Sequence, residues 1–189
     1  MENREIFLSD LFKSDKFKEK WLLQLISTVI FSIVIMTITA TFSEENTNWV
    51  YVVIFSVISV LWMILIYYIV IFIISKIMKS KSKSASFIKA SITITFVTFF
   101  VKVIVAIIQL IFSIDLNEHD LLSLNILNIN NPILNAIDLY IFLSSYLLIL
   151  GLYYSSHLKG KTAIIFGCIF LFVNLFFNIV FTLINNAIM

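Results

Sequence analysis

Five long apolar runs, separated by short polar segments, divide this chain. Each run has about the 20 residues that an α-helix needs to cross the hydrocarbon core of a bilayer. The runs cover residues 21–42, 49–74, 90–114, 132–154 and 162–184. Barrel strands do not fit, because they are about ten residues long and alternate strictly between apolar and polar side chains. The pattern therefore predicts an all-α protein, a polytopic membrane bundle of five transmembrane helices.

Residues 1–20 precede the first run and mix apolar with charged side chains. Their apolar members follow a helical spacing and include Ile6, Phe7, Leu8, Leu11, Phe12 and Phe17. We predict a short amphipathic helix on the inner membrane surface, which either anchors the first span or binds a partner. The remaining polar segments are too short to fold alone, so residues 21–189 would form one transmembrane domain.

Basic residues are distributed unevenly between alternate polar segments. All but one of the 13 lysines and arginines lie in residues 1–20, 75–89 and 155–161. Loops 43–48 and 115–131 contain acidic residues but no Lys or Arg. By the positive-inside rule, the N-terminus and the basic loops face the cytoplasm. With five spans, the C-terminus would then lie outside.

The composition limits the class of protein. Of the 189 residues, 61% are hydrophobic and 13% are charged, whereas a soluble domain is about 45–50% apolar and about 25% charged. A soluble enzyme and a disordered tail do not fit, and the single cysteine, Cys168, cannot form an internal disulfide. Heavy use of Ile, Asn, Lys and Phe is typical of low-GC bacteria. We therefore expect a multi-pass protein of a bacterial cytoplasmic membrane.

Motifs of catalysis are missing from the sequence. It contains no GxSxG, HExxH, Gly-rich phosphate loop or CxxC motif. Ser155, Ser156 and His157 are adjacent, but neighbours on a helix do not face each other, and no carboxylate is placed to orient the imidazole. The DLNEHD segment at 115–120 offers ligands to a divalent ion, although an acidic solvated loop is the simpler interpretation. We expect no enzyme activity, no cofactor and no metal site.

The loop 75–89 is the most basic segment outside the N-terminus. Its lysines include Lys76, Lys79, Lys81 and Lys83. Because anionic lipid attracts lysine at the cytoplasmic leaflet, we predict that these four contact lipid headgroups. Docking of an acidic partner and phosphorylation of the loop serines are alternatives. Nucleic-acid binding is not expected, because the loop has no aromatic stacking platform.

Two charged residues interrupt the apolar runs. Lys102 lies about 18 Å from either end of its run, near the bilayer centre, and Asp138 lies about 9 Å from the outer end of the next. An isolated charge at the centre of a membrane helix costs about 2.5–3.5 kcal/mol on insertion scales, and such residues usually face the bundle interior. We therefore predict an ion pair or a water-bridged pair between Lys102 and Asp138.

Uncharged polar residues also follow helical stripes within the runs. Gln109 lies on the same side as Lys102, Asn131 and Asn135 share a face with Asp138 and Ser145, and Asn174 and Asn178 share a face of the last run. The first two runs carry Gln24, Thr28, Ser32, Thr39, Ser56 and Ser59. These residues either hold the bundle in register or line a pathway for a solute, a proton or a lipid headgroup. Lys102, Gln109, Asp138, Asn174 and Asn178 form the candidate intramembrane cluster.

The C-terminal half carries short motifs of a known kind. An acid and an aromatic, Asp138-Leu139-Tyr140, stand near one end of a helix, Gly151-Leu152 near the other, and the basic turn Lys159-Gly160-Lys161 follows. With five spans, this layout resembles the Yip1-like membrane proteins in their small bacterial form. The resemblance implies a five-helix fold without enzymatic chemistry. In eukaryotic members it implies roles in vesicle trafficking through small GTPases.

Three functions follow from these observations. The first is a non-enzymatic scaffold or accessory subunit that contacts lipid, a membrane protein partner or a second copy of the chain. The second is a transport or channel component with a polar intramembrane pathway. The third is an immunity or stress-protection protein. The scarcity of glycine argues against an alternating-access carrier, because such transporters often build their binding site from helices that Gly or Pro interrupts.

Overall fold

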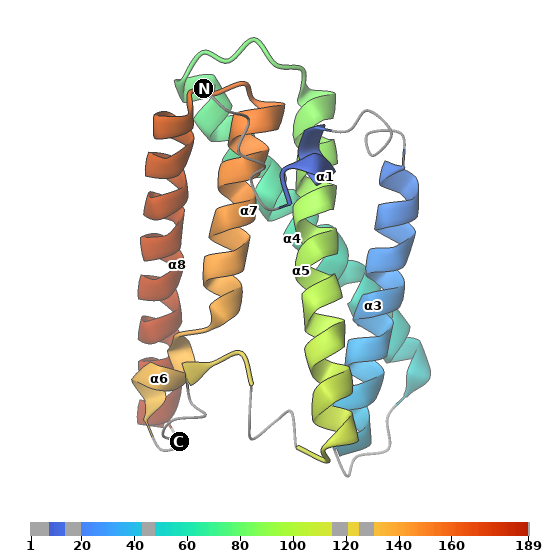
Figure 1. Cartoon of the computed structure of the whole chain (residues 1–189). Coiled ribbons are helices and arrows are strands. Elements are labelled where there is room, and N and C mark those ends of the chain that lie inside the picture. The colour runs from blue at the N-terminus through green and yellow to red at the C-terminus, as the bar shows by residue number, and fades with distance from the viewer. Residues whose placement is uncertain (1–7, 14–19, 43–47, 115–120, 125–130, 189) are drawn as a thin grey trace.

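The computed structural model describes residues 8–13, 20–42, 48–114, 121–124 and 131–188. These residues form helices and no strand beyond a single isolated bridge. The helices are α1 (Asp10–Lys13), α3 (Trp21–Phe42), α4 (Trp49–Ile77), α5 (Ser84–Ile111), α6 (Pro132–Ala136), α7 (Leu139–Ser155) and α8 (Gly160–Ile188) (Figure 1). The all-α prediction is confirmed.

Among the described residues, four helices are long and apolar enough to cross a membrane, namely α3, α4, α5 and α8. The apolar helix α7 has 17 residues and measures about 26 Å, somewhat less than the hydrocarbon core of about 30 Å. The first span begins and ends where the sequence predicts. Helix α4 continues to Ile77, past its predicted end at residue 74, and α5 begins at Ser84, before its predicted start at residue 90. The predicted loop 75–89 therefore shrinks to residues 78–83.

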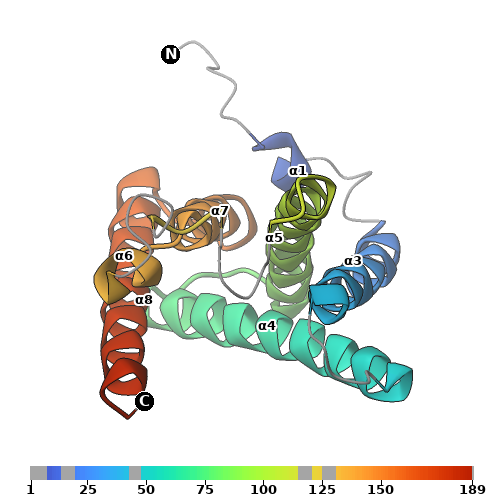
Figure 2. The same ribbon diagram turned by 90° about the horizontal axis from the view of Figure 1, so that it is seen from below.

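The long helices run in alternate directions (Figure 1). Helix α5 contacts α3, α4 and α7, and α8 packs against α6 and α7. Viewed along the bundle, α4 is steeply inclined and passes from the α3 side to the α8 side (Figure 2). The first residues of α3, α5 and α8 and the last residues of α4 and α7 share one end of the bundle. We call this the basic end, because Lys76, Lys79, Lys81, Lys83, Lys159 and Lys161 lie there.

The hydrophobic core fills the half of the bundle next to the basic end. Its fully buried side chains include Ile71 of α4, Ile94 of α5 and Leu147 and Leu148 of α7. Gly151 lets α7 approach closely, since a Cβ there would lie 3.3 Å from Cδ1 of Ile94. Burial of these apolar side chains holds α4, α5 and α7 together on this side of the bundle.

Polar side chains join α3 to α4 and α5. The Ser32 hydroxyl lies 3.2 Å from that of Ser59 and 3.4 Å from the carbonyl oxygen of Ser56. Thr28 is fully buried and donates to the carbonyl oxygen of Gln24. The predicted polar stripe of the first span therefore faces the bundle interior.

The predicted span 132–154 is not one continuous helix. Ile137 and Asp138 adopt extended backbone conformations between α6 and α7. The Asp138 carboxylate caps α7 by accepting a hydrogen bond from the backbone nitrogen of Tyr140 at 2.8 Å. Short polar side chains that bond the nearby backbone compete with helical hydrogen bonds, which explains the interruption. The sequence predicts one helical face that carries Asn131, Asn135, Asp138 and Ser145. This prediction is wrong, because the interruption divides these residues between two helices and the segment that joins them.

A short segment from the preceding loop pairs with the interruption. The backbone nitrogen of Leu139 donates to Leu122, and that of Leu124 donates to Ile137, at 2.8 and 3.0 Å. Ser123 and Asp138 form the antiparallel bridge between these bonds. The pairing supplies partners to backbone groups that the broken helix leaves open, which a non-aqueous environment requires.

Only a small part of the predicted N-terminal helix is described. Helix α1 has four residues, and its Phe12 is buried against the core together with half-buried Leu8 and Leu11. Ile6, Phe7 and Phe17 lie outside the described residues. The described part packs on α5 and α7, so it contacts the bundle itself.

Candidate functional site

A cavity of about 290 Å³ lies near the middle of α4, α5 and α8 and beside the first turn of α7. Its polar lining residues are Tyr67, Thr98, Lys102, Tyr140, Ser144, Asn174 and Asn178. We call it the Lys102 cavity. Three residues of the predicted cluster, Lys102, Asn174 and Asn178, therefore meet at one site.

A second cavity of about 160 Å³ adjoins the same lysine on the side away from the basic end. It is lined by Gln109 and Ala106 of α5 and by Leu122 of the pairing segment. Lys102 and Tyr140 line both cavities. Gln109 therefore belongs to the same polar region as Lys102, while Asn174 and Asn178 lie on the other side of the Lys102–Tyr140 contact.

Tyr140 connects the two charged residues of the spans. The Lys102 ammonium lies 4.4 Å from the centroid of the Tyr140 ring and 6.0 Å from that of Phe99. The Asp138 carboxylate holds the Tyr140 backbone nitrogen. A cation this close to an aromatic face is attracted by the negative potential of the ring. The ion pair between Lys102 and Asp138 stays a prediction.

Three further polar side chains of the Lys102 cavity donate hydrogen bonds to the backbone. The hydroxyls of Thr98 and Ser144 donate to Ile94 and Ile141 at 2.9 and 3.1 Å. The Asn174 amide donates to Phe170 at 2.8 Å. Since a hydroxyl oxygen that donates keeps acceptor lone pairs, the cavity combines one cation with several acceptor oxygens. A polar lining of this kind suits water or a small polar ligand.

Asn178 ties α8 to the interrupted helix. Its amide nitrogen donates to the carbonyl oxygen of Ala136, the last residue of α6, at 3.4 Å. The start of α7 thus lies beside the cavity, with α6 held by α8. Discontinuous helices of this kind place helix ends at binding sites inside membranes. No glycine marks this break in the amino-acid sequence.

The four lysines predicted to contact lipid lie together at the basic end. Lys76 stands over the Phe72 ring at 5.6 Å, and Lys83 precedes the first turn of α5. Nearby, Ser75 donates to the Ser156 hydroxyl at 2.8 Å, and Ser80 donates to the Ser156 carbonyl oxygen at 2.6 Å. These bonds connect the two basic loops. Headgroup contact of Lys76, Lys79, Lys81 and Lys83 remains a prediction.

The sequence reasoning missed Tyr67, Thr98, Tyr140 and Ser144 as site residues. Thr98 lies four residues before Lys102 and Ser144 four residues after Tyr140, so helical periodicity offered a signal for both. Tyr67 comes from α4, whose rotation is set by packing. The acidic segment 115–120, considered as an ion site, lies outside the described residues.

Comparison with protein families, with curated proteins and with solved structures finds no match to this chain. The resemblance to Yip1-like proteins therefore remains a prediction that rests on its short motifs alone.

Proposed function

We propose that the chain is a five-span protein of a bacterial cytoplasmic membrane, with its basic end in the cytoplasm. The basic loops share one end of the bundle (Figure 1), as the positive-inside rule requires. Helix α6, the interruption and α7 together form the fourth span. This proposal has a direct test in single cysteines placed at the two ends.

In a Cys168→Ser background, Lys81→Cys reports on the basic end and Asn48→Cys on the opposite end. Both positions are exposed. In intact cells, a membrane-impermeant maleimide should label Asn48→Cys and leave Lys81→Cys unlabelled until the membrane is opened. The reverse labelling would overturn the proposed orientation.

We further propose that the protein is a non-enzymatic transport or channel component that admits a small anion to Lys102. The observation that carries this proposal is the pair of cavities that meet at Lys102 and Tyr140 beside an interrupted helix. Irregular backbone at membrane depth is tolerated where it is buried in protein or lines a water-filled cavity. A lysine ammonium in such a cavity attracts anions and repels cations.

The basic half of the bundle closes this pathway. Tyr67 forms the boundary between the Lys102 cavity and the core cluster around Ile71, Ile94, Leu147 and Leu148. Passage to the basic end therefore requires α4, α5 and α7 to separate there. With the proposed orientation, the core cluster would close the pathway toward the cytoplasm.

Anion efflux from proteoliposomes tests the transport proposal. Vesicles loaded with chloride or formate should release the anion faster with the protein than without it. Lys102→Met should reduce the added rate at least about tenfold, Lys102→Arg should retain much of it, and the exposed Lys161→Met, a matched loss of charge, should not change it. Efflux equal to that of empty vesicles for both anions would overturn the proposal.

The second candidate is the scaffold or accessory subunit. The observation that favours it is the exposed apolar face of α8, where Phe172, Phe176 and Phe181 are 63–70% exposed within this single chain. Such a face packs equally well against lipid or against another membrane helix. Crosslinking from α8 followed by mass spectrometry should then identify a reproducible partner, and its absence would count against the scaffold.

A further inference from the structure

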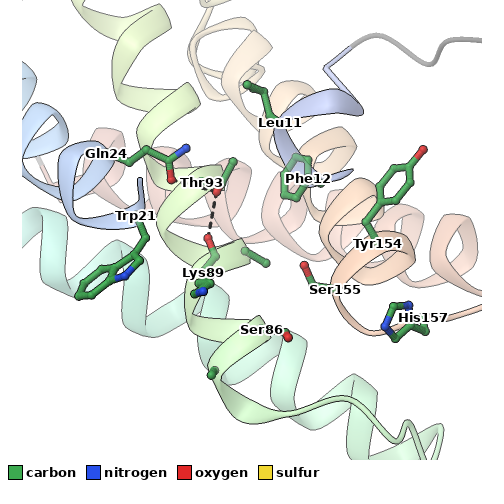
Figure 3. A pocket seen from close by; sticks show the side chains of 12 residues that line it. Leu11, Phe12, Trp21, Gln24, Ser86, Lys89, Thr93, Tyr154, Ser155 and His157 are labelled. Atoms are coloured by element: carbon green, nitrogen blue, oxygen red, sulfur yellow. Dashed lines mark hydrogen bonds between the residues drawn. The ribbon is translucent and has the colours of Figure 1, made fainter. Parts of the chain in front are cut away.

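A third cavity, of about 130 Å³, lies at the basic end between the first turns of α3 and α5, helix α1 and the end of α7 (Figure 3). Its lining shares no residue with the Lys102 cavity or with the cavity beside Gln109. The polar side chains of its lining include Gln24, Ser86, Lys89, Thr93, Tyr154, Ser155 and His157. We call it the Gln24 cavity.

Gln24 brings a buried hydrogen-bond donor to this cavity without a partner for it. The residue is only 4% exposed, and its amide nitrogen Nε2 makes no hydrogen bond to any of the residues that the structure describes. Its amide oxygen, in contrast, accepts from the Thr93 hydroxyl at 3.2 Å, a hydroxyl shared with the Lys89 carbonyl oxygen (Figure 3). Because buried amide nitrogens nearly always have an acceptor, the cavity is shaped for a ligand that supplies one.

The charge around the cavity selects an anionic acceptor. Lys89 contributes an ammonium, Ser86 and Ser155 contribute hydroxyls, and none of the described residues that line the cavity is acidic. Both α3 and α5 begin here, at Trp21 and Ser84, and Lys83 makes no side-chain cap on α5. The N-terminus of a helix carries partial positive charge and open backbone N–H groups, which favour phosphate and other anions.

The surroundings of the cavity match the headgroup level of a bilayer. Trp21 stands at the start of a span, where interfacial aromatic residues gather. Leu11 and Phe12 of α1 provide an apolar wall next to the polar one. With the proposed orientation, the cavity faces the leaflet that is rich in anionic lipid.

We propose that the Gln24 cavity binds a phosphate group, with Gln24 and Lys89 as its main contacts and an anionic phospholipid as its source. The amide nitrogen of Gln24 donates to a phosphate oxygen, and the Lys89 ammonium balances the charge. The leaflet assignment rests on the proposed topology, whereas the chemistry of the cavity does not. This site is distinct from diffuse headgroup contact at Lys76, Lys79, Lys81 and Lys83.

Thermal unfolding of the full chain in lipid nanodiscs tests the proposal. Phosphatidylglycerol, added at rising fractions to phosphatidylcholine discs, should raise the Tm of the wild type. Gln24→Glu, which places a carboxylate against the phosphate, and Lys89→Met should each weaken the apparent affinity by at least about tenfold, since charge-assisted hydrogen bonds are lost. Lys161→Met, exposed at the same end and outside the lining, should behave as the wild type.

Two further arms make the outcomes decisive. The first arm adds inorganic phosphate to phosphatidylcholine discs and so distinguishes a free anion from a lipid headgroup. If phosphate raises the Tm of the wild type but not that of Gln24→Glu, the cavity binds phosphate from a soluble source. If Gln24→Glu fails to fold in phosphatidylcholine alone, Gln24→Leu and Lys89→Met carry the test. Equal phosphatidylglycerol shifts in the wild type and in all folded cavity variants would overturn the proposal. Lys102→Met should keep the full shift, so failure of anion efflux does not affect this result.

Discussion

The Lys102 ammonium lies 4.4 Å from the centroid of the Tyr140 ring, and the same tyrosine is held through its backbone by the Asp138 carboxylate. One residue at the start of α7 thus contacts both charges that the sequence places inside spans. This arrangement links α5 to α7 where the predicted span 132–154 is interrupted. Two roles of Asp138 can be distinguished here. Capping α7 requires an acceptor oxygen but no charge, whereas the predicted ion pair with Lys102 requires the negative charge.

The contact between Lys102 and Tyr140 should show an energetic coupling. We expect Lys102→Met, Tyr140→Leu and the double variant to give a coupling of about 0.5–2 kcal/mol, the range for cation–π pairs from exposed to desolvated sites. The measurement is the free energy of unfolding in mixed micelles titrated with SDS, arranged as a double-mutant cycle. Phe99→Leu is the matched control, because its ring centroid is 6.0 Å from the ammonium. Equal coupling for both rings would contradict a specific Lys102–Tyr140 contact.

The cap at Asp138 gives a prediction of its own. Asp138→Asn keeps an acceptor oxygen for the Tyr140 nitrogen, whereas Asp138→Ala removes it. We expect Asp138→Ala to destabilise the protein by about 1 kcal/mol, a typical cost of losing an N-cap, and Asp138→Asn to lose less than half of that. The same unfolding titration provides the values. Equal losses for the two variants would show that the negative charge matters more, as the predicted ion pair with Lys102 requires.

Sequence reasoning located the helices well where charge marks their ends. The first span begins and ends as predicted because Lys20 and Glu44 flank an uncharged run. The interruption near Asp138 was not predicted, because apolar neighbours on both sides made residues 132–154 read as one span. An Asp before an apolar run is also an N-cap signal, and here the structure follows that second interpretation.

The candidate site was predicted in part for a physical reason. Helical periodicity brings Lys102 and Gln109 to one face of α5, and Asn174 and Asn178 to one face of α8, so each set could be found from spacing. Which helices meet depends on packing, which spacing does not encode. Tyr67 of α4 was therefore not predicted as a site residue. The Gln24 cavity was not predicted either, because it depends on how α1, α3, α5 and α7 pack together.

The two glycines inside α7 and α8 should respond differently to alanine. A Cβ on Gly151 would lie 3.3 Å from the end of the Ile94 side chain and at an ordinary contact distance of 3.7 Å from Ala90 and Ile71, so a few tenths of an ångström of movement by Ile94 would accommodate it. A Cβ on Gly167 would overlap the Ile149 side chain and lie 3.4 Å from the Ser145 carbonyl oxygen. Alanine favours a helix over glycine by about 1 kcal/mol, so we expect Gly151→Ala to be neutral or stabilising.

For Gly167→Ala, the overlap forces Ile149 out of its position in the α7–α8 contact, and overpacking of this kind costs about 1–3 kcal/mol. The Tm of each variant in one detergent provides the comparison. The double variant Gly167→Ala/Ile149→Ala removes the obstructing side chain and should recover part of the lost stability. A Tm for Gly167→Ala at or above that of the wild type would show that α7 and α8 do not pack as closely as described.

Helix α5 ends at Ile111 with Phe112 as its C-cap, and the next residue, Ser113, is left-handed although it is not glycine. Ser113 has φ 53°, and the backbone nitrogen of Ile114 donates to Gln109 at 2.8 Å, which closes the helix end. A side chain in this conformation costs about 1–2 kcal/mol, a cost that glycine avoids. We therefore expect Ser113→Gly to stabilise the protein by about 0.5–1 kcal/mol, measured as a rise in Tm. Ser113→Ala is the control, because it removes the hydroxyl but keeps the Cβ, and it should produce no such rise. An equal rise in Tm for Ser113→Ala would show that the stabilisation comes from removal of the exposed hydroxyl and not from the backbone conformation.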